Sequence, residues 1–349
     1  MSPVAAMVAE ASRPGPGIRV SVIVPVYNGR PGLERCLAAL NAGRGPEAEI
    51  IVVDDASTDG SGAVAAHMGA RVLRLEPNQG PAAARNHGAR DARGDILFFV
   101  DADVVVVSGT IDRVRTTMDG RPDVVAVFGS YDMKPDAHGI VSRYKNLLHH
   151  FVHQNAKTEA STFWAGCGAI RRAVFAEMRG FDQDRFREPS VEDIELGYRL
   201  RRAGHRILLD KGLQGTHLKA WTLRSLLWTD VMGRAVPWSR LTLEGRQVVD
   251  DLNLRRDQRL SAALVAISLG GLLFVPWRPG LVVLPVAALA AVVGLNRRLY
   301  GFFVRQGGVR FATLCVLLHW LYYLYSALTY SAVWLSFRVR TMLAHPPSR

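Results

Sequence analysis

Apolar and polar residues follow two alternating patterns along the first 215 or so residues of the chain. Short runs rich in β-branched residues, at 19–28, 49–57 and 71–78, and the apolar run that leads into Asp101, predict strands. Segments between them predict helices, and in 31–42 the apolar residues at helical spacing are Leu33, Cys36, Leu37 and Leu40. The strand segments are apolar without alternation. We therefore expect an α/β fold with a mostly parallel sheet that is flanked by helices on both faces.

The pattern changes near residue 259, where three long uncharged stretches begin. They cover 18, 17 and 27 residues, at 260–277, 280–296 and 311–337. Roughly 20 apolar residues span a bilayer, so the third stretch predicts a transmembrane helix. The first two are shorter and, with Arg278–Pro279 between them, predict a helical hairpin. We expect about three transmembrane helices over 259–337; a buried soluble bundle is the alternative.

Basic residues suggest an orientation for this region. Arg297, Arg298, Arg305 and Arg310 precede the last apolar stretch, in a predicted loop. By the positive-inside rule this loop is cytoplasmic, so we expect a multi-pass protein of the inner (plasma) membrane with a cytoplasmic N-terminal domain. A last spanning helix then places the basic residues at 338 and 340 outside, a conflict that a re-entrant segment would remove.

Residues 216–258 combine aromatic, apolar and basic positions before the predicted spans. Trp221 and Trp228 interleave with Arg224 and Arg234, which predicts amphipathic helices lying in the membrane interface, with ordinary core-packing helices as the alternative. The expected organisation is a disordered tail at 1–17 without a signal peptide, a catalytic domain at 18–215, these interface helices, the transmembrane region at 259–337 and a C-terminal tail at 338–349.

The amino-acid composition restricts the classes of partner that we expect this protein to bind. The net charge of +12 and the pI of about 10.1 indicate anionic partners such as phosphorylated small molecules or acidic lipid, unless they only reflect an Arg-rich composition. No aromatic–basic stacking motif is present, which argues against nucleic acid. The three cysteines are far apart and form no metal-binding spacing, so we expect buried, reduced thiols.

Polar residues end three of the predicted strands: Tyr27 with Asn28, Asp54 with Asp55, and Asp101 with Asp103. The carboxyl ends of parallel strands meet at one edge of a sheet, where ligands bind. Two carboxylates at i and i+2 on an extended segment share a face and repel each other. A divalent Mg²⁺ or Mn²⁺ ion that also binds a diphosphate would remove this repulsion.

The phosphate is not held by a familiar glycine-rich loop, because the chain has neither a P-loop nor a GxGxxG motif after the first strand. Asn78, Gly80 and Arg85 lie where the third strand ends and a helix begins, and backbone N–H groups and a guanidinium there favour anions. An aspartate at the end of the second strand is placed to accept a hydrogen bond from a nucleobase.

Five linked motifs resemble the family 2 glycosyltransferases of the GT-A fold, which is Rossmann-like, and specifically the membrane-anchored bacterial type. They are VSVIVPVYN, IIVVDDASTDGS, NQGPAAARNHG, GDILFFVDAD and the segment from FWAGCGAI to EPSVEDIELGYRLRRAG, spread over about residues 19–215. The resemblance implies a nucleotide-diphospho-sugar in the first half of the domain. It assigns donor contacts to the motif positions Pro25, Tyr27, Asn28, Asp55, Arg85, Asp101 and Gly166.

The resemblance also implies the metal site and the base. Asp103 would ligate the metal, and His217 would complete its site as in some lipid-directed relatives, although a lone histidine is more often structural. Glu192 and Asp193 begin a predicted helix, where acidic residues also stabilise the helix dipole. In the family the aspartate of such a pair is the catalytic base.

The sequence thus predicts an inverting glycosyltransferase that moves one sugar from a nucleotide-sugar, with UDP favoured, to a lipid, polyprenyl-phosphate or glycan acceptor at the membrane. A processive polysaccharide synthase is one alternative, although no QxxRW motif follows the domain. A non-catalytic nucleotide-sugar-binding scaffold is another, against which the intact acidic residues argue.

Overall fold

The computed structural model describes residues 19–245 and 255–344, which form two compact units. Unit 1 contains the described residues up to Ala137 together with His153–Ala220, and unit 2 contains His138–Val152 and the described residues from Trp221 onward. The tail predicted at 1–17 lies outside the described residues, as do the last part of the predicted interface segment and the final five residues.

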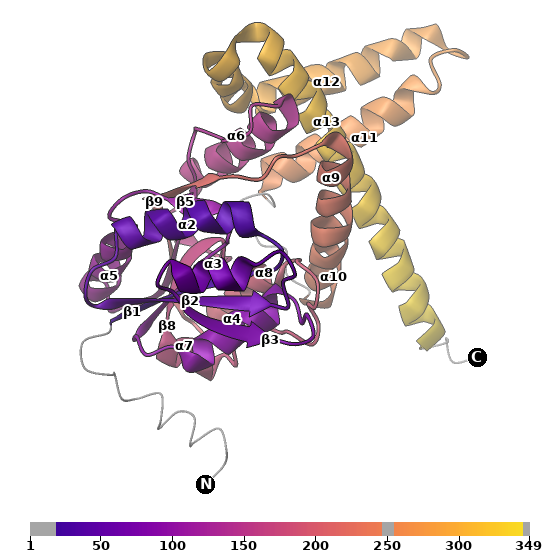
Figure 1. The fold of residues 1–349 in the computed structure, drawn as a ribbon. Coiled ribbons are helices and arrows are strands. Elements are labelled where there is room, and N and C mark those ends of the chain that lie inside the picture. The colour runs from indigo at the N-terminus through magenta and orange to yellow at the C-terminus, as the bar shows by residue number, and fades with distance from the viewer. Residues whose placement is uncertain (1–18, 246–254, 345–349) are drawn as a thin grey trace. The chain divides into compact units, whose positions relative to one another are not determined.

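Unit 1 is a mixed β-sheet with helices on both faces (Figure 1). Its strands are β1 (Val20–Val26), β2 (Ala48–Asp55), β3 (Arg71–Leu75), β4 (Ile96–Val100), β5 (Val104–Val106), β6 (Val124–Tyr131), β7 (Glu159–Ala160), β8 (Cys167–Arg171) and β9 (Arg206–His217). Its helices are α2 (Arg30–Ala42), α3 (Ser61–His67), α4 (Pro81–Asp91), α5 (Thr110–Gly120), α7 (Arg172–Glu177) and α8 (Glu192–Arg202). The predicted α/β class is confirmed.

The strand order is β3-β2-β1-β4-β8-β6-β9-β5, and β7 also pairs with β9. β3, β2, β1 and β4 are mutually parallel. β8 is antiparallel to both β4 and β6, so β6 runs in the same direction as β4, and β9 is parallel to β6. The carboxyl ends of β1, β2, β4, β6 and β9 therefore lie at one edge of the sheet.

Each of the first strands buries both of its faces, which explains why its sequence does not alternate. Val22 and Val24 of β1 belong to the core on the side of α2, α3 and α5, to which α2 contributes the four apolar residues predicted from its spacing. On the other side, Gly88 of α4 lies against Ile23 and Val53, so closely that a Cβ there would be 2.6 Å from an Ile23 methyl group. Three cysteines are buried and free, as predicted.

Unit 2 is helical. It contains most of α6 (Ile140–Gln154), α9 (Leu223–Trp228), a π-helix η1 (Thr229–Ala235), α10 (Val236–Gly245), α11 (Arg256–Leu272), the 3₁₀ turn η3 (Pro279–Val282), α12 (Val283–Leu295) and α13 (Arg297–Ala344). The expected catalytic domain at 18–215 is thus interrupted, because Tyr144 and Leu147 of α6 are buried in an apolar cluster with Trp221, Leu226 and Phe303 of unit 2.

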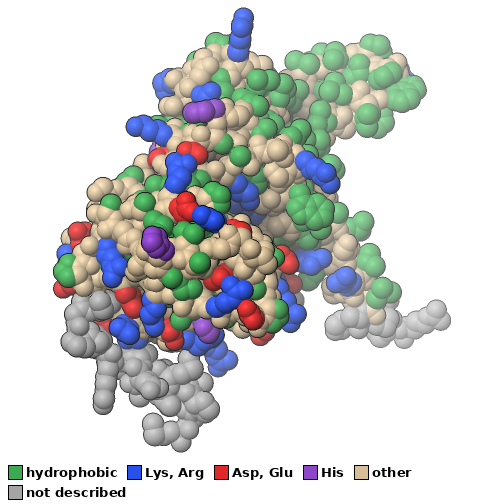
Figure 2. Space-filling model, in the orientation of Figure 1, with side chains coloured by type: hydrophobic (Ala, Val, Ile, Leu, Met, Phe, Trp, Pro, Cys, Tyr) green, Lys and Arg blue, Asp and Glu red, His purple; other side chains and the backbone are tan. Residues whose placement is uncertain are grey.

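α11 and α12 form the predicted helical hairpin around Arg278–Pro279. Ser268 Oγ of α11 donates to the Pro285 carbonyl oxygen of α12 at 2.8 Å, and Nδ2 of Asn296, which caps α12, donates to Ser261 Oγ of α11 at 3.0 Å. The large apolar side chains near the turn are exposed: Leu273, Phe274, Trp277, Val283 and Leu284. Figure 2 shows apolar side chains gathered over the end of the hairpin on the face in view.

The basic segment after the hairpin is not the predicted loop. Arg297, Arg298, Arg305 and Arg310 lie in α13, which consists of two helices joined at a kink where Gly307 and Gly308 are not helical. The segment is helical because Leu299, Tyr300, Phe302 and Phe303 form an apolar face that is buried in the cluster of unit 2. The helix also continues through the predicted tail as far as Ala344.

Among the described residues, one helix is long and apolar enough to cross a membrane, Arg297–Leu343, and the apolar segment Pro279–Leu295 is shorter. At about 1.5 Å per residue, α11 and α12 do not reach the roughly 30 Å of a bilayer core. Three complete spans therefore stay a prediction.

The fold allows a test of the loop that leads into α4. Gly80 has φ 87° and ψ 167°, a conformation essentially restricted to glycine, and a Cβ on it would lie 1.7 Å from the Arg187 carbonyl oxygen. Gly69 also has a positive φ, 78°, but open space around its Cα. We expect Gly80→Ala to lower the Tm of the purified protein by several degrees more than Gly69→Ala. Equal losses in thermal unfolding would contradict this close approach.

Candidate active site

The edge at which β1, β2, β4, β6 and β9 end collects the polar residues that the sequence predicted to meet there. Asp55 ends β2, Asp101 follows β4 directly, and His217 ends β9. Tyr131 at the end of β6 joins them, with Asp132 next in the chain. Strand direction alone therefore brings together side chains that are far apart in sequence.

Asp101 and Asp103 are not on an extended segment, contrary to the prediction. They lie in a tight turn between β4 and β5, which the Val104 N–H closes by donating to the Asp101 carbonyl oxygen at 2.9 Å. Their carboxylates have different partners: Asp101 Oδ1 accepts from Arg85 Nη2 at 2.7 Å, and Asp103 Oδ2 lies 3.3 Å from His217 Nε2. Groups of the chain itself, and not only a metal ion, therefore offset the negative charge of this pair.

Arg85 is the buried centre of the site, with a side chain that is 7% exposed. Its Nη2 donates to Asp101, and its Nη1 donates to Glu192 Oε1 at 2.8 Å. Burial lowers the pKa of Arg85, but the charges of Asp101 and Glu192 more than offset this effect and hold it above its ordinary value. Both terminal nitrogens of Arg85 thus bind carboxylates. The predicted contact of this guanidinium with the donor would therefore involve nitrogens that are already hydrogen-bonded within the protein.

Asp193 lies in the first turn of α8, beside this ion-pair network. Its Oδ2 accepts from the Ala165 N–H at 3.1 Å, and its Oδ1 accepts from the Ile194 N–H at 2.8 Å. Burial raises the pKa of Asp193 and the neighbouring Glu192 carboxylate raises it further, to about 7, against partial offsets by the Ala165 N–H and Arg85. A carboxylate with a pKa near neutrality can accept a proton during a reaction at physiological pH.

Glu192 has a structural environment that differs from that of Asp193. Its side chain is 6% exposed, and its Oε2 accepts from the Ser190 N–H at 3.1 Å while Oε1 binds Arg85. Both oxygens are engaged, so the structure places Glu192 as a group that orients Arg85 and raises the pKa of Asp193.

Asp103 and His217 provide a possible divalent-metal site. Partial burial raises the pKa of Asp103, but its hydrogen bond with His217 and the charges of His217 and Lys219 outweigh this effect, so the pKa lies below its ordinary value. A carboxylate oxygen and an imidazole nitrogen that face each other form a donor set that fits Mn²⁺. No group of three or more His, Cys, Asp or Glu side chains is arranged for a metal within residues 19–245 and 255–344. An ion here would need ligand oxygens and water as well, which is typical of Mg²⁺ and Mn²⁺.

Aromatic rings fix the orientation of His217. The ring of Tyr131 stacks on its imidazole with centroids 4.3 Å apart and planes 7° apart, and Trp164 packs edge-on against Tyr131 at 4.9 Å. Sequence reasoning missed Tyr131, Asp132 and Trp164. The apolar run at 124–128, followed by polar residues at 129–132, was the signal of another strand ending at this edge.

Asp55, at the end of β2, accepts hydrogen bonds from the loop that follows β3. Asp55 is buried, and its two carboxylate oxygens accept from the Gln79 and Gly80 N–H groups, both at 2.8 Å, while Asn78 Nδ2 donates to the Asp55 carbonyl oxygen at 3.0 Å. The Gly80 N–H was predicted to face an anionic ligand. It faces the Asp55 carboxylate instead, because this carboxylate is the anion that the loop encloses.

The end of β1 is the most open part of the site. Tyr27 is 56% exposed and Pro25 is partly buried. Asn28 adopts φ 49°, and its Oδ1 accepts from the Thr58 N–H at 2.8 Å, which ties the end of β1 to the loop after β2. The exposed ring of Tyr27 is available for stacking, as the predicted base pocket requires.

Gly166 directly precedes β8 and lies at the same site. Its carbonyl oxygen accepts from the Asp101 N–H at 3.2 Å, and a Cβ on it would lie 2.6 Å from the Trp164 ring. The glycine therefore leaves room for the Trp164 ring, and the approach of this backbone to a donor sugar stays a prediction.

Comparisons with known proteins agree with this geometry. Residues 21–179 match the family described as Glycosyl transferase family 2. The chain is 30% identical over 231 residues to the Pre-mycofactocin glycosyltransferase of Mycobacterium tuberculosis, covering 61% of this chain and 47% of that protein. It is 34% identical over 121 residues to the uncharacterized glycosyltransferase EpsJ of Bacillus subtilis, covering 34% of this chain and 35% of that one. The matched region thus spans between about a third and a half of these relatives.

The fold is also found in a solved structure. The mannosyltransferase PcManGT from Pyrobaculum calidifontis, in complex with GDP-Man and Mn²⁺, superposes with a TM-score of 0.56 at 19% sequence identity, covering 94% of each chain. Its likeness supports the architecture. This likeness shows the GT-A fold, and residues 21–179 of the chain are similar to glycosyltransferase family 2.

Proposed function

We propose that this protein is an inverting glycosyltransferase that moves one sugar from a nucleotide-diphospho-sugar to a lipid or lipid-linked acceptor at the cytoplasmic face of a membrane. The observation that carries the proposal is the pairing of Asp193, whose pKa is about 7, with the buried Arg85 network that also holds Asp101. A partly buried carboxylate whose pKa is near neutrality, beside a fixed carboxylate at the ligand-binding edge of the sheet, is suited to proton abstraction.

Asp193 is the proposed base. In its ionised form it takes a proton from the acceptor hydroxyl, and the hydroxyl oxygen then attacks the anomeric carbon as the nucleoside diphosphate leaves. A single displacement inverts the configuration at that carbon. If the acceptor is a phosphate, its oxygen is already ionised, and Asp193 then contributes less to the rate.

Arg85 and Glu192 are proposed positioning residues. Arg85 fixes the Asp101 carboxylate, which the proposal places against the sugar or ribose of the donor. Glu192 holds the second nitrogen of the fork and keeps Asp193 basic through its negative charge. A lysine at position 85 has no planar fork and cannot reproduce both contacts.

Asp103 and His217 would hold the divalent ion, which stabilises the negative charge of the leaving diphosphate when it is bound. The related fold of PcManGT was solved with GDP-Man and Mn²⁺, which supports testing nucleotide-sugars together with Mn²⁺. Tyr27, Pro25 and Asp55 are the proposed contacts for the nucleobase, with UDP as the favoured nucleotide and GDP as its comparison in any donor panel.

Unit 2 supports the membrane part of the proposal. Its helix α13 has the length and composition of a membrane span, and the α11–α12 hairpin exposes apolar side chains such as Phe274 and Trp277. The chain also carries a net charge of +12, which favours anionic lipid and phosphorylated substrates. A lipid or lipid-linked acceptor fits these features.

Replacing Asp193 by Asn is expected to lower kcat by about 10²- to 10⁴-fold and to leave the affinity for the donor within a few-fold of the wild type. In the wild type, kcat/KM for a hydroxyl acceptor should rise with pH to a plateau above about pH 7, because Asp193 must be ionised. The measurement is transfer of labelled sugar and titration of the donor. Asp184→Asn, the same change at an exposed carboxylate nearby, is the control; comparable turnover in both variants would remove Asp193 from the mechanism.

The same variant has a predicted effect on stability. A carboxyl whose pKa is raised from 3.8 to about 7 on folding keeps its proton in the folded state, so the free energy of unfolding falls by about 1.4 kcal/mol per pH unit between about pH 4 and 7. Asn lacks this titration. The Tm of Asp193→Asn minus that of the wild type should therefore increase from pH 5 to pH 8, measured by thermal unfolding without ligands. A difference that does not change with pH would refute the raised pKa.

The metal site is tested through donor binding. In the wild type, we expect Mn²⁺ and a nucleotide-sugar together to raise the Tm more than either alone, because only bound ligands stabilise the fold. Asp103→Ala should abolish this synergy, and His217→Ala should weaken the affinity for Mn²⁺ by about 10- to 100-fold. Asp184→Asn again serves as the control. Transfer activity that survives both chelation and Asp103→Ala would exclude the metal from the reaction.

A further inference from the structure

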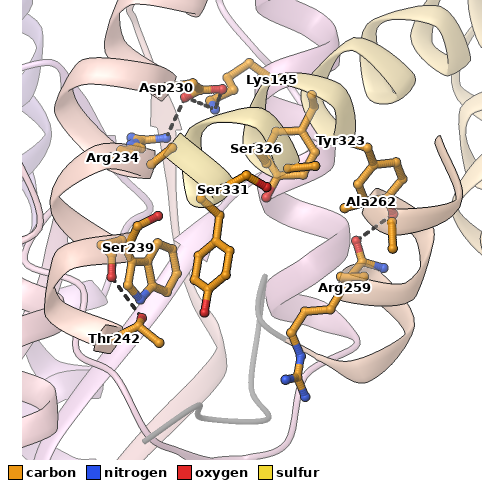
Figure 3. Close-up of a pocket in the computed structure, with 17 residues that line it drawn as sticks. Lys145, Asp230, Arg234, Ser239, Thr242, Arg259, Ala262, Tyr323, Ser326 and Ser331 are labelled. Atoms are coloured by element: carbon orange, nitrogen blue, oxygen red, sulfur yellow. Dashed lines mark hydrogen bonds and ion pairs between the residues drawn. The ribbon is translucent and has the colours of Figure 1, made fainter. Parts of the chain in front are cut away.

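Unit 2 contains a cavity of about 490 Å³ that is lined by residues of α6, η1, α10, α11 and α13 (Figure 3). Its one acidic lining residue, Asp230, accepts from Lys145 Nζ at 2.6 and 2.7 Å and lies 3.5 Å from Arg234 Nη1. No residue of the candidate active site lines this cavity. The metal ligands and the base come from separate segments of unit 1, so the residues that hold them in register belong to unit 1.

Residues 163–166, between β7 and β8, contact two parts of the candidate active site through their backbone. The Gly166 carbonyl oxygen accepts from the Asp101 N–H at 3.2 Å. The Ala165 N–H donates to Asp193 Oδ2 at 3.1 Å. Two consecutive residues of this segment therefore hold the turn that carries the donor carboxylate and the proposed base.

The ring of Trp164 connects the same segment with the metal ligands. It packs edge-on against Tyr131, with ring centroids 4.9 Å apart and planes 86° apart. Tyr131 stacks on His217 with planes 7° apart, and His217 Nε2 lies 3.3 Å from Asp103 Oδ2. Because edge-on and stacked ring pairs have preferred geometries, a shift of the Trp164 ring would tilt Tyr131 and change the direction in which the His217 nitrogens point.

The position of the Trp164 ring is itself restricted on several sides. The ring lies so close to Gly166 that a Cβ there would be 2.6 Å from it. The His153 ring lies on another neighbouring segment, with its centroid 6.0 Å from that of Trp164. Trp164 and Tyr131 are both partly buried against the core of unit 1. Close packing of this kind leaves a side chain few alternative rotamers, so the ring can transmit a fixed geometry.

We propose that Trp164 is a positioning residue that holds the metal ligands and the base in register with each other. Its ring orients His217 through Tyr131, and its backbone neighbour Ala165 holds Asp193. The inference deepens the proposed function and rests on it, because it requires a divalent ion at His217 and a base at Asp193. Trp164 performs this role without touching the donor or the acceptor.

The first test measures Mn²⁺ binding to the full chain without nucleotide-sugar, by electron paramagnetic resonance of the free ion. We expect Trp164→Leu and Tyr131→Leu each to raise the Kd for Mn²⁺ about tenfold, because residues that orient a metal ligand typically change affinity by about 10- to 100-fold. Tyr131→Phe keeps the stacked ring and should stay within about twofold of the wild type. Phe175→Leu removes a ring that packs on Phe99 and Phe181 instead, and it is the matched control.

A double-mutant cycle separates orientation of His217 from a general loss of stability. In the His217→Ala background no imidazole remains to be oriented. Trp164→Leu should therefore leave the Kd for Mn²⁺ within about twofold of that of His217→Ala alone. A further tenfold loss in this background would overturn the proposal, because Trp164 would then act on the metal site without His217.

The second test concerns the base. The Ala165 N–H lowers the pKa of Asp193, whose charged neighbours Glu192 and Arg85 are unchanged in the variants. Displacing the segment in Trp164→Leu weakens this hydrogen bond, so the pH at which kcat/KM reaches half of its plateau should rise. The measurement is transfer to a hydroxyl acceptor at saturating Mn²⁺. Tyr131→Leu leaves the Ala165 contact in place and should keep the wild-type pH profile.

The outcomes distinguish this inference from the proposed function. Wild-type protein that binds no Mn²⁺, or binds it equally well in His217→Ala, would contradict the proposed metal site and this inference with it. Mn²⁺ binding that depends on His217 but not on Trp164 would overturn the inference alone, as would an unchanged pH profile in Trp164→Leu. Weaker Mn²⁺ binding in Trp164→Leu and Tyr131→Leu, with Phe175→Leu unchanged and the pH profile shifted only in Trp164→Leu, supports it.

Discussion

The bidentate pairing of Arg85 with Asp101 and Glu192 is the interaction on which the site depends. Three carboxylates, those of Asp101, Glu192 and Asp193, lie close enough to Arg85 for each to influence its pKa. Without a buried cation, this concentration of negative charge would be strongly destabilising, because a buried charge without a partner costs several kcal/mol. One guanidinium balances two of the carboxylates and leaves the third, Asp193, with a raised pKa. The same ion pairs that keep the site folded therefore produce its candidate base.

The direction of the strands determines which side chains share this site. β8 runs antiparallel between β4 and β6, and this reversal sets β6 and β9 parallel to the first four strands. Tyr131 and His217 consequently join Asp101 and Asp103 at one edge. The donor side, the metal ligands and the base can then be supplied by separate segments of the chain that a single sheet holds rigidly.

Unit 2 follows different physical requirements. Its helices bury one apolar cluster around Phe303 while α11 and α12 leave large apolar side chains exposed. A soluble domain rarely leaves so much apolar surface uncovered, which agrees with a lipid environment for these helices. The Lys145–Asp230 ion pair is buried in the same unit, where it is stabilised by the Tyr325 hydroxyl.

The sequence by itself determined the fold class, the early strands and helices, the buried face of α2 and the helical hairpin, because these depend on local periodicity and turn residues. The acidic strand ends were also visible, as were the motifs of the family. It did not show that Asp101 and Asp103 lie in a turn, since the position at which a strand ends can move by two residues without changing the hydrophobic pattern of the strand. Nor did it show that the residues from Arg297 up to the kink at Gly307 and Gly308 are helical, because positive charge predicted a loop in a segment whose apolar face is buried.

Only the tertiary structure decided how each charge is balanced. Arg85 and Glu192 are 107 positions apart, and Asp103 lies in the turn before β5 whereas His217 ends β9. It also assigned α6 to unit 2, and it revealed the part played by Tyr131 and Trp164. The physical reason is that periodicity records which residues are buried, whereas the pKa of Asp193 and the partner of each carboxylate depend on distances between segments that only folding brings together.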